Sequence, residues 1–270
     1  MSREANSVTV NWTPARAQYE QDGYVVFQNV LDAELVAEGR AHVDWLQARH
    51  PNLRPEQLGH WLVTHDAFWV RLVSDDRLLD IAEQFIGPNI ALFASHYICK
   101  PPYDGQPVLW HQDGSYWPLT PMEVVTLWLA IDDSVPENGC MRVIPRTQHE
   151  SLRELKQRKD IANVLESGMD ESLVDESKAV DVVVRAGGVS VHHPNIIHGS
   201  NANTSPVWRR GLTIRYIPTT TQIGGLKPGE RQPSAFLLRG AEVSGLNDYN
   251  SWPAYDPAHS MPFRGCEAWK

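Results

Sequence analysis

The stretch VVTLWLAI, residues 124–131, decides the fold class because its side chains alternate between two kinds of position. One set is apolar, at Val125, Leu127, Leu129 and Ile131, and the other set is Thr126, Trp128 and Ala130. A period of two is typical of a β-strand with one face against a core. The strand is therefore expected to turn its apolar set toward the core and Trp128 toward a cavity.

Further strand-like stretches lie on both sides of this one. They comprise residues 24–27, 90–98, 108–113, 141–144, 179–184, 189–193 and 207–217. Turn-rich clusters such as residues 101–105 and 201–206 separate neighbouring stretches. Short strands joined by such loops predict an antiparallel sandwich or barrel, so the chain is expected to be mainly β.

Helices are expected outside this β core. Asp32 caps a helix with apolar residues at three- and four-residue intervals, and Ser74 opens a second helix that stops at Gly87-Pro88. Residues 149–178 form an acidic insertion, helical over 150–166, which is either a solvated surface or a lid over a substrate. Apart from this insertion, residues 1–270 are expected to form a single domain.

Composition excludes several classes of protein. The 270 residues include 24 Lys and Arg against 33 Asp and Glu, giving a formal charge of −9, which argues against a nucleic-acid partner. No apolar run is long enough to span a membrane. The three cysteines are an odd number without paired spacing, so we expect no disulfide framework and a cytoplasmic location. The oligomeric state is left open.

The sharpest chemical signal is the pair His111 and Asp113. In a strand, residues two apart project from the same face, roughly 6.6–7 Å apart, so both side chains can reach one ion. His198 is the best candidate for a third ligand. Two imidazoles and a carboxylate on one side of an ion form the facial triad of non-haem Fe(II) oxygenases, whose open positions take a chelating cosubstrate and O₂. A His-x-Asp pair alone occurs by chance in many chains.

A candidate cosubstrate anchor follows eleven residues after His198, at Arg209. Alternation in residues 207–217 gives a mostly apolar face and a polar one, the latter with Arg209, Gly211, Thr213 and Arg215. An arginine on a cavity wall can hold a carboxylate by two parallel hydrogen bonds. The distal end of a dicarboxylate such as 2-oxoglutarate requires such a contact.

These motifs together resemble the phytanoyl-CoA dioxygenase family of Fe(II)- and 2-oxoglutarate-dependent oxygenases. The matching stretches, in family order over about residues 15–220, are Gly87-Pro88-Asn89-Ile90, Lys100-Pro101-Pro102, Trp110-His111-Gln112-Asp113, Trp128, Glu137-Asn138-Gly139-Cys140, His193-Pro194, His198-Gly199-Ser200 and Arg209. The resemblance implies a double-stranded β-helix, or jelly-roll, with helices behind the larger sheet. It also implies hydroxylation of a small-molecule substrate by O₂, with 2-oxoglutarate decarboxylated to succinate and CO₂.

Site roles carry over position by position as implications of the same resemblance. The Fe(II) ligands, which are also the catalytic residues, would be His111, Asp113 and His198. The 2-oxoglutarate site would comprise Arg209, Trp128, Ser200 and His96. The chain departs from the family pattern at Pro145–His149 and at Gly188-Val189, which leaves the substrate class open.

Other interpretations of these residues remain open. The same ligands could hold Zn²⁺ in a hydrolase, although such an enzyme has no need for Arg209; a family member that has lost catalysis is a further alternative. Trp117 and Tyr116 either form a substrate wall or pack in the core, and Arg215 binds either an anionic substrate or a buried acid. Three residues are expected to have structural roles only. His192 and His193 are expected to be core histidines on opposite strand faces, and Cys140 a small buried hydrophobic residue.

Overall fold

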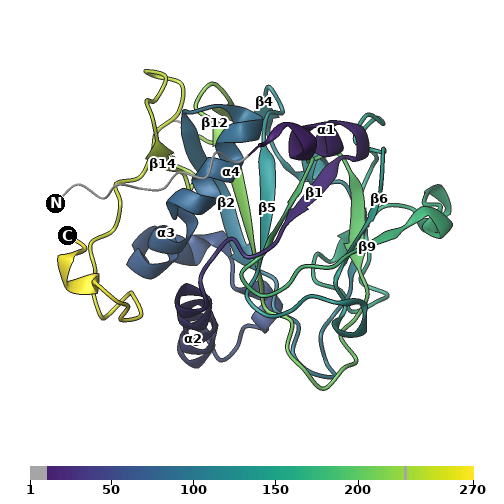
Figure 1. Ribbon diagram of the computed structural model, residues 1–270, viewed down its shortest axis with the longest axis horizontal. Helices are drawn as coiled ribbons and strands as arrows, with labels where there is room; N and C mark the ends of the chain where they lie inside the picture. Colours follow the sequence, from purple (N-terminus) through teal and green to yellow (C-terminus); the bar gives the residue numbers. More distant parts are fainter. Residues whose placement is uncertain (1–10, 228–229) are drawn as a thin grey trace.

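A computed structural model describes residues 11–227 and 230–270, and at its centre is a six-stranded antiparallel sheet (Figure 1). In spatial order its strands are β1 (Tyr24–Phe27), β10 (Val189–His192), β5 (Val125–Ala130), β12 (Gly211–Pro218), β2 (Ile90–Tyr97) and β14 (Phe236–Arg239). Five of these were predicted. The last of the predicted stretches, residues 207–217, becomes a strand only from Gly211.

A second antiparallel sheet of four strands lies beside the first, to the right in Figure 1. Its order is β3 (Val108–His111), β11 (Ile197–Ser200), β6 (Met141–Ile144) and β9 (Val180–Val182). Two ribbons complete the β structure, β4 (Leu119–Thr120) with β13 (Gln222–Ile223) and β7 (Lys156–Gln157) with β8 (Ser167–Gly168). Residues of both main sheets line one cavity, so the predicted mainly β architecture of antiparallel sheets is confirmed.

Helices cover one face of the large sheet (Figure 1). They are α1 (Thr13–Asp22), α2 (Ala33–Arg49), α3 (Ala67–Val73) and α4 (Asp76–Ile86). The main apolar core fills the space between helices and sheet, where Leu127, Leu129 and Ile214 are fully buried. No helix in the described part of the chain combines the length and the apolar character needed to cross a membrane.

The helix boundaries agree in part with those predicted. Asp32 caps α2 by accepting a hydrogen bond from the Leu35 backbone N–H at 2.9 Å. The predicted start of α4 at Ser74 is wrong, because Asp75 is its cap and Ser74 ends the preceding helix. That helix, α3, was not predicted because nearly all of it is buried, so its sequence lacks an amphipathic period.

The prediction of a helix over residues 150–166 is also wrong. The segment 149–178 contains only the short ribbon β7–β8 and two 3₁₀ turns. Its charged side chains form local ion pairs instead, such as Arg158 with Asp160 and Glu171 at 2.8 and 3.0 Å. Helix-forming residue types without an apolar stripe gave this segment no face to pack against the core.

Candidate active site

Two rows of side chains project from the inner face of the large sheet, opposite the helices. Cross-strand pairing aligns the first row as His192, Thr126, Arg215 and Ala94, and the second as Ser190, Trp128, Thr213 and His96. Strand alternation sends the intervening apolar residues into the helical core. The predicted facing of residues 124–131 and 207–217 is therefore confirmed, and the packing outside the sheet fixes which side chains lie inside.

The small sheet brings the His111 and His198 rings together. They are paired across β3 and β11, with ring centroids 4.1 Å apart. Asp113 joins them from a 3₁₀ turn, Asp113–Tyr116, and donor atoms of the three buried side chains lie within 4.8 Å of one another. The structure thus assembles the three residues that the sequence singles out.

The strand geometry invoked for Asp113 is wrong, however. Strand β3 ends at His111, and the next residue, Gln112, ties two loops to the turn. Its side-chain amide donates to the Asn195 carbonyl at 2.8 Å and accepts from the Arg153 backbone N–H at 2.9 Å. The turn that follows delivers Asp113 to the site, and a spacing of two residues alone could not reveal it.

The donor set fits a divalent metal ion. Nδ1 of His111 lies 2.8 Å from the Leu109 carbonyl, and Nδ1 of His198 lies 3.0 Å from that of Ile196. Each Nδ1 therefore carries the proton, which leaves both Nε2 lone pairs free toward Asp113. Burial is the main cause that holds the pKa of His198 well below its ordinary value, so this imidazole is neutral as a ligand must be.

Asp113 is ionised despite its burial. Loss of solvent would raise its pKa, but the charge of Arg215 and the contacts with His111 and His192 outweigh this and hold the pKa well below its usual range. Oδ1 faces Nε2 of His111 at 3.5 Å, whereas Oδ2 accepts from the Thr126 hydroxyl at 3.4 Å. One carboxylate oxygen is therefore turned toward the histidines and the other toward the sheet.

Arg209 is buried at the far end of the cavity. It lies just ahead of β12, in an isolated bridge with Lys100, and its guanidinium stands 5.1 Å from the Trp128 ring. It donates to the carbonyls of Gly139 and Ile98 at 2.9 and 3.0 Å, while its Nε has no partner among the described residues. A planar cation held in this way keeps donors available for an acid group.

Lys100 is a second cation at this end, and the sequence marked it only as part of a motif. Its ammonium group is buried and donates to the Ser200 hydroxyl at 2.7 Å and to the Asn201 carbonyl. Burial, then the nearby charge of Arg209, holds the pKa of Lys100 well below its usual value. An anion bound next to Ser200 would offset both the loss of solvent around the Lys100 ammonium group and its repulsion from Arg209.

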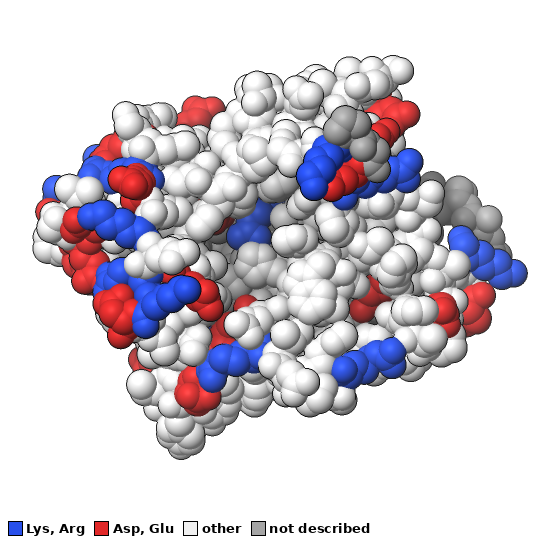
Figure 2. Space-filling view, turned by 180° about the vertical axis from the view of Figure 1, so that it is seen from behind, with Lys and Arg blue, Asp and Glu red and all other residues white. Residues whose placement is uncertain are grey.

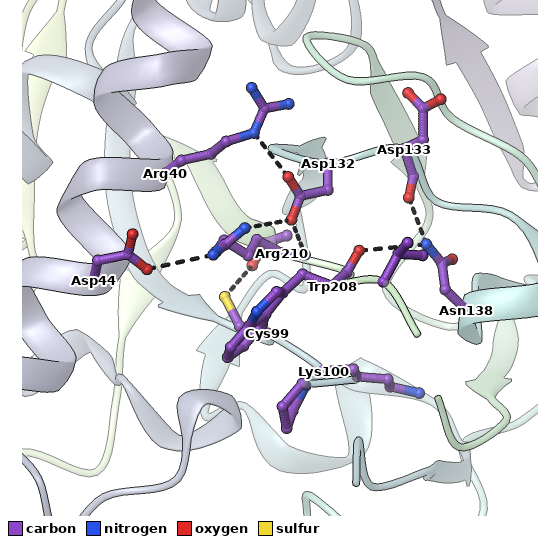
Figure 3. A network of polar contacts seen from close by, with 12 residues as sticks. Arg40, Asp44, Cys99, Lys100, Asp132, Asp133, Asn138, Trp208 and Arg210 are labelled. Carbon is purple, nitrogen blue, oxygen red and sulfur yellow. Dashed lines mark hydrogen bonds and ion pairs between the residues drawn. The ribbon is translucent and has the colours of Figure 1, made fainter. Parts of the chain in front are cut away.

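Arg210 does not line the cavity, and Figure 3 shows its guanidinium among acidic partners. It is bonded to Asp132 at 3.0 Å and to Asp44 at 3.3 Å, and Arg40 reaches the same Asp132 at 2.8 Å. Its guanidinium also lies 4.6 Å from the Trp208 ring. Adjacent arginines therefore serve different faces, as alternation in the sequence predicts.

The cavity between the sheets has a volume of about 340 Å³. Besides the residues already placed there, the candidates Trp128, Ser200, His96, Trp117, Tyr116 and Arg215 all line it. A hollow with basic atoms on its floor is visible in Figure 2, and Arg209 and Arg215 are the basic lining residues. The sequence did not single out His60, Phe93 or Gln232, which also line it, because no motif or period marks them.

The expectation that His192 is a core histidine is wrong. It lines the cavity, and neither ring nitrogen has a hydrogen-bond partner among the described residues. His193 does face away, since its Nδ1 accepts from the Asn195 backbone N–H at 3.1 Å. Cys140 is buried, and burial raises the pKa of its thiol to about 11, as expected for an inert residue.

Comparison with known proteins adds a family and a fold. The family model described as "Phytanoyl-CoA dioxygenase (PhyH)" matches residues 19–211. The chain is 32% identical over 148 residues to the "Probable alpha-ketoglutarate-dependent hypophosphite dioxygenase" of Stutzerimonas stutzeri, covering 54% of this chain and 51% of that protein. It is 31% identical over 146 residues to human peroxisomal phytanoyl-CoA dioxygenase, covering 52% and 43%. The aligned part thus spans about half the length of these relatives.

Solved structures share the fold over most of the chain. The apo form of ThoJ, a non-haem monooxygenase, superposes with a TM-score of 0.74 at 24% identity, covering 90% of both chains. EctD from S. alaskensis, solved with 2-oxoglutarate and 5-hydroxyectoine, gives a TM-score of 0.64 at 20% identity, covering 91% of this chain and 89% of that one. At these identities the likeness establishes the jelly-roll fold.

Proposed function

Because this chain belongs to the phytanoyl-CoA dioxygenase family, we propose that it is an Fe(II)- and 2-oxoglutarate-dependent dioxygenase that hydroxylates a small molecule. One observation carries the proposal: a buried His111, Asp113 and His198 cluster shares its cavity with the buried cation Arg209. The cluster suits a metal with open positions, and the cation suits a dicarboxylate. A hydrolase site would need only the first of these.

The metal would be held by Nε2 of His111, Nε2 of His198 and Oδ1 of Asp113. The backbone carbonyls behind each Nδ1 fix the tautomers and the ring orientations. When bound, Fe(II) would supply O₂ activation, coupled to decarboxylation of 2-oxoglutarate to succinate and CO₂. The protein contributes the three ligands on one side, so the other positions stay free for cosubstrate and O₂.

The distal carboxylate of 2-oxoglutarate would bind Arg209, with the Ser200 hydroxyl and the ammonium group of Lys100 beside it. Lys100 and Ser200 are already joined by a 2.7 Å hydrogen bond, and a backbone bridge holds Lys100 beside Arg209. The Trp128 ring, which lies against the Arg209 guanidinium, would border the distal carboxylate of the cosubstrate. His96 lies in the same row as Trp128, with Thr213 of β12 between them, and would border the cosubstrate.

The substrate would enter beside Tyr116, Trp117 and Arg215, which line the same cavity. A cavity of about 340 Å³ is at the small end for ligand sites and must also admit the cosubstrate, so the reacting part of the substrate is compact. We propose no nucleic-acid partner, because the net charge of −9 is unfavourable for binding a polyanion. The proposed cytoplasmic location rests on the free thiols of Cys99, Cys140 and Cys266, which a reducing compartment preserves.

The test is succinate release from 2-oxoglutarate by anaerobically purified, Fe(II)-loaded protein after exposure to O₂. We expect turnover that requires Fe(II), that Zn²⁺ cannot support, and that is lost in Asp113→Ala. A metabolite screen for substrates that stimulate succinate release, read by mass spectrometry for a product with one added oxygen, would then identify the substrate. Zinc as the purified metal, with no succinate formed under any condition, would refute the proposal.

A further inference from the structure

The cavity holds a buried cation that the proposed cosubstrate does not use. Arg215 is 7% exposed, and its guanidinium stands 5.1 Å from the Trp117 ring. Nη1 donates to the Thr213 hydroxyl at 3.0 Å and lies 2.8 Å from Nδ1 of His96. Nη2 has only the Asp113 carboxylate 3.7 Å away, and Nε has no partner among the described residues. Such a group is costly to bury unless a ligand supplies acceptors.

Charge points to the same conclusion. Arg209 and Arg215 line the cavity, and Asp113 is the only carboxylate among the described lining residues. The formal charges of Fe(II) and 2-oxoglutarate cancel when both are bound. The loaded cavity therefore keeps an excess positive charge and offers no acid to pair with a substrate amine.

An independent feature lies on the other side of Asp113. His192 is 2% exposed, lines the cavity, and has no hydrogen-bond partner on either ring nitrogen among the described residues. It stands in the same cross-strand row as Arg215, with Thr126 between them. Its Nε2 is 3.6 Å from Oδ2 of Asp113. Unused donors thus flank the site on both sides.

On the premise of the proposed function, we propose that the substrate is a compact oxyanion, a small acid whose carboxylate, phosphonate or phosphinate group binds Arg215. The planar guanidinium, stacked on Trp117, offers parallel donors to two oxygens of such a group, and neutral His192 can donate to it from across the row. Apolar lining residues, among them Phe93, would contact the rest of the molecule. Since Arg215 and the metal ligands meet at the same carboxylate, oxidation occurs within a few bonds of the acid group.

The test uses the unmodified protein with Fe(II) and saturating 2-oxoglutarate under argon, so binding is measured without turnover. Calorimetry first records 2-oxoglutarate binding and then titrates butanoate, butylphosphonate, butanamide and butylamine, which share one carbon frame. We expect at least one acid to bind about tenfold more tightly than the amide, because hydrogen bonds to a charged group are stronger than neutral ones. Butylamine should not bind.

Variants then test whether Arg215 causes the preference for acids over the amide. Arg215→Gln should reduce the ratio of acid to amide affinity to near one, and Arg215→Lys should retain part of it. Arg142→Gln is the matched control, because Arg142 also stands over a tryptophan, 5.4 Å from the Trp110 ring, but pairs with Glu176 and Asp181 outside the cavity. Iron content and the thermal midpoint are measured for each variant.

The inference is overturned if the amide or the amine binds as tightly as the acids, if neither acid binds, or if Arg215→Gln keeps the full preference. The comparison of probes on the unmodified protein stands even if a variant fails to fold. Failure of the proposed function has a different signature. In that case 2-oxoglutarate itself would not bind, or would bind equally well to Arg209→Ala.

Discussion

Arg209→Ala should raise the KM for 2-oxoglutarate steeply while leaving Fe(II) binding intact. Arg209 is 2% exposed, so solvent screens its charge little, and two of its N–H groups are already committed to the carbonyls of Gly139 and Ile98. Removing one partner of a buried charge-assisted pair costs on the order of 2–4 kcal/mol. This corresponds to roughly 30- to 1,000-fold weaker cosubstrate binding.

The neighbouring residue provides the matched comparison. Arg210→Ala should leave the KM for 2-oxoglutarate unchanged, because this arginine is bonded to Asp132 and Asp44 on the outer face (Figure 3). Loss of the better-buried pair with Asp132 should lower the free energy of unfolding by about 1–3 kcal/mol. Arg209→Ala also loses stability, since it strips donors from two buried carbonyls, so loss of stability alone does not separate the two variants.

The assay is succinate formation against 2-oxoglutarate concentration, with Fe(II) saturating and at a temperature below both unfolding transitions. Iron content is measured on the same samples. If Arg210→Ala weakened cosubstrate binding and Arg209→Ala did not, the facing of residues 209–215 would be inverted and the cosubstrate end of the cavity misassigned.

Three further predictions concern the metal, the cavity wall and a helix cap. Asp113→Ala and His198→Ala should each abolish bound iron and succinate formation without unfolding the protein, checked by metal analysis and circular dichroism; retention of iron in either would contradict the ligand set. Gly211→Ala should destabilise the protein by about 1–3 kcal/mol and weaken 2-oxoglutarate binding, because an added Cβ would lie 2.0 Å from Cζ2 of Trp128. Asp32→Ala should cost about 1 kcal/mol at pH 7 through loss of the α2 cap. Backbone hydrogen bonding at the helix start, then the Arg77 side chain, lowers the pKa of Asp32 to about 2, so its contribution is full above the ordinary carboxyl pKa and falls as the pH drops toward 2. Denaturant unfolding of the unmodified protein and of Asp32→Ala should therefore show their difference in free energy of unfolding shrinking between pH 7 and pH 2. A difference that stays constant over this range would refute the prediction.

Strand alternation accounts for most of what the sequence could predict. In residues 207–217 a side chain on the wrong face would place either Leu212 in a polar cavity or Arg215 in the helical core, so the pattern determines the facing. Helices were harder to predict. The α1 helix has no fully buried residue and α3 is buried nearly all round, and neither situation leaves an amphipathic period in the sequence.

The site residues that escaped prediction share a different cause. His192 shares a strand face with Ser190, whereas Val189 and Val191 face the helical core, but the sequence of so short a strand does not show which face lines a cavity. Phe93 and Gln232 come from segments far apart in the chain that only the closed fold brings together. Asp113 was identified from the family motif, although it lies in the 3₁₀ turn after the strand. The turn places its carboxylate beside the two histidines.

The two faces of the large sheet separate the residues that line the cavity from the residues that stabilise the fold. Exchanging Ala94, His192 or Arg215 would alter the lining of the cavity, whereas the residues that anchor the strands to the helices lie on the reverse side. A lineage can therefore acquire new substrates by altering one row of side chains while the folding core behind it stays as it is. A library restricted to that row would sample new chemistry with little loss of folded protein.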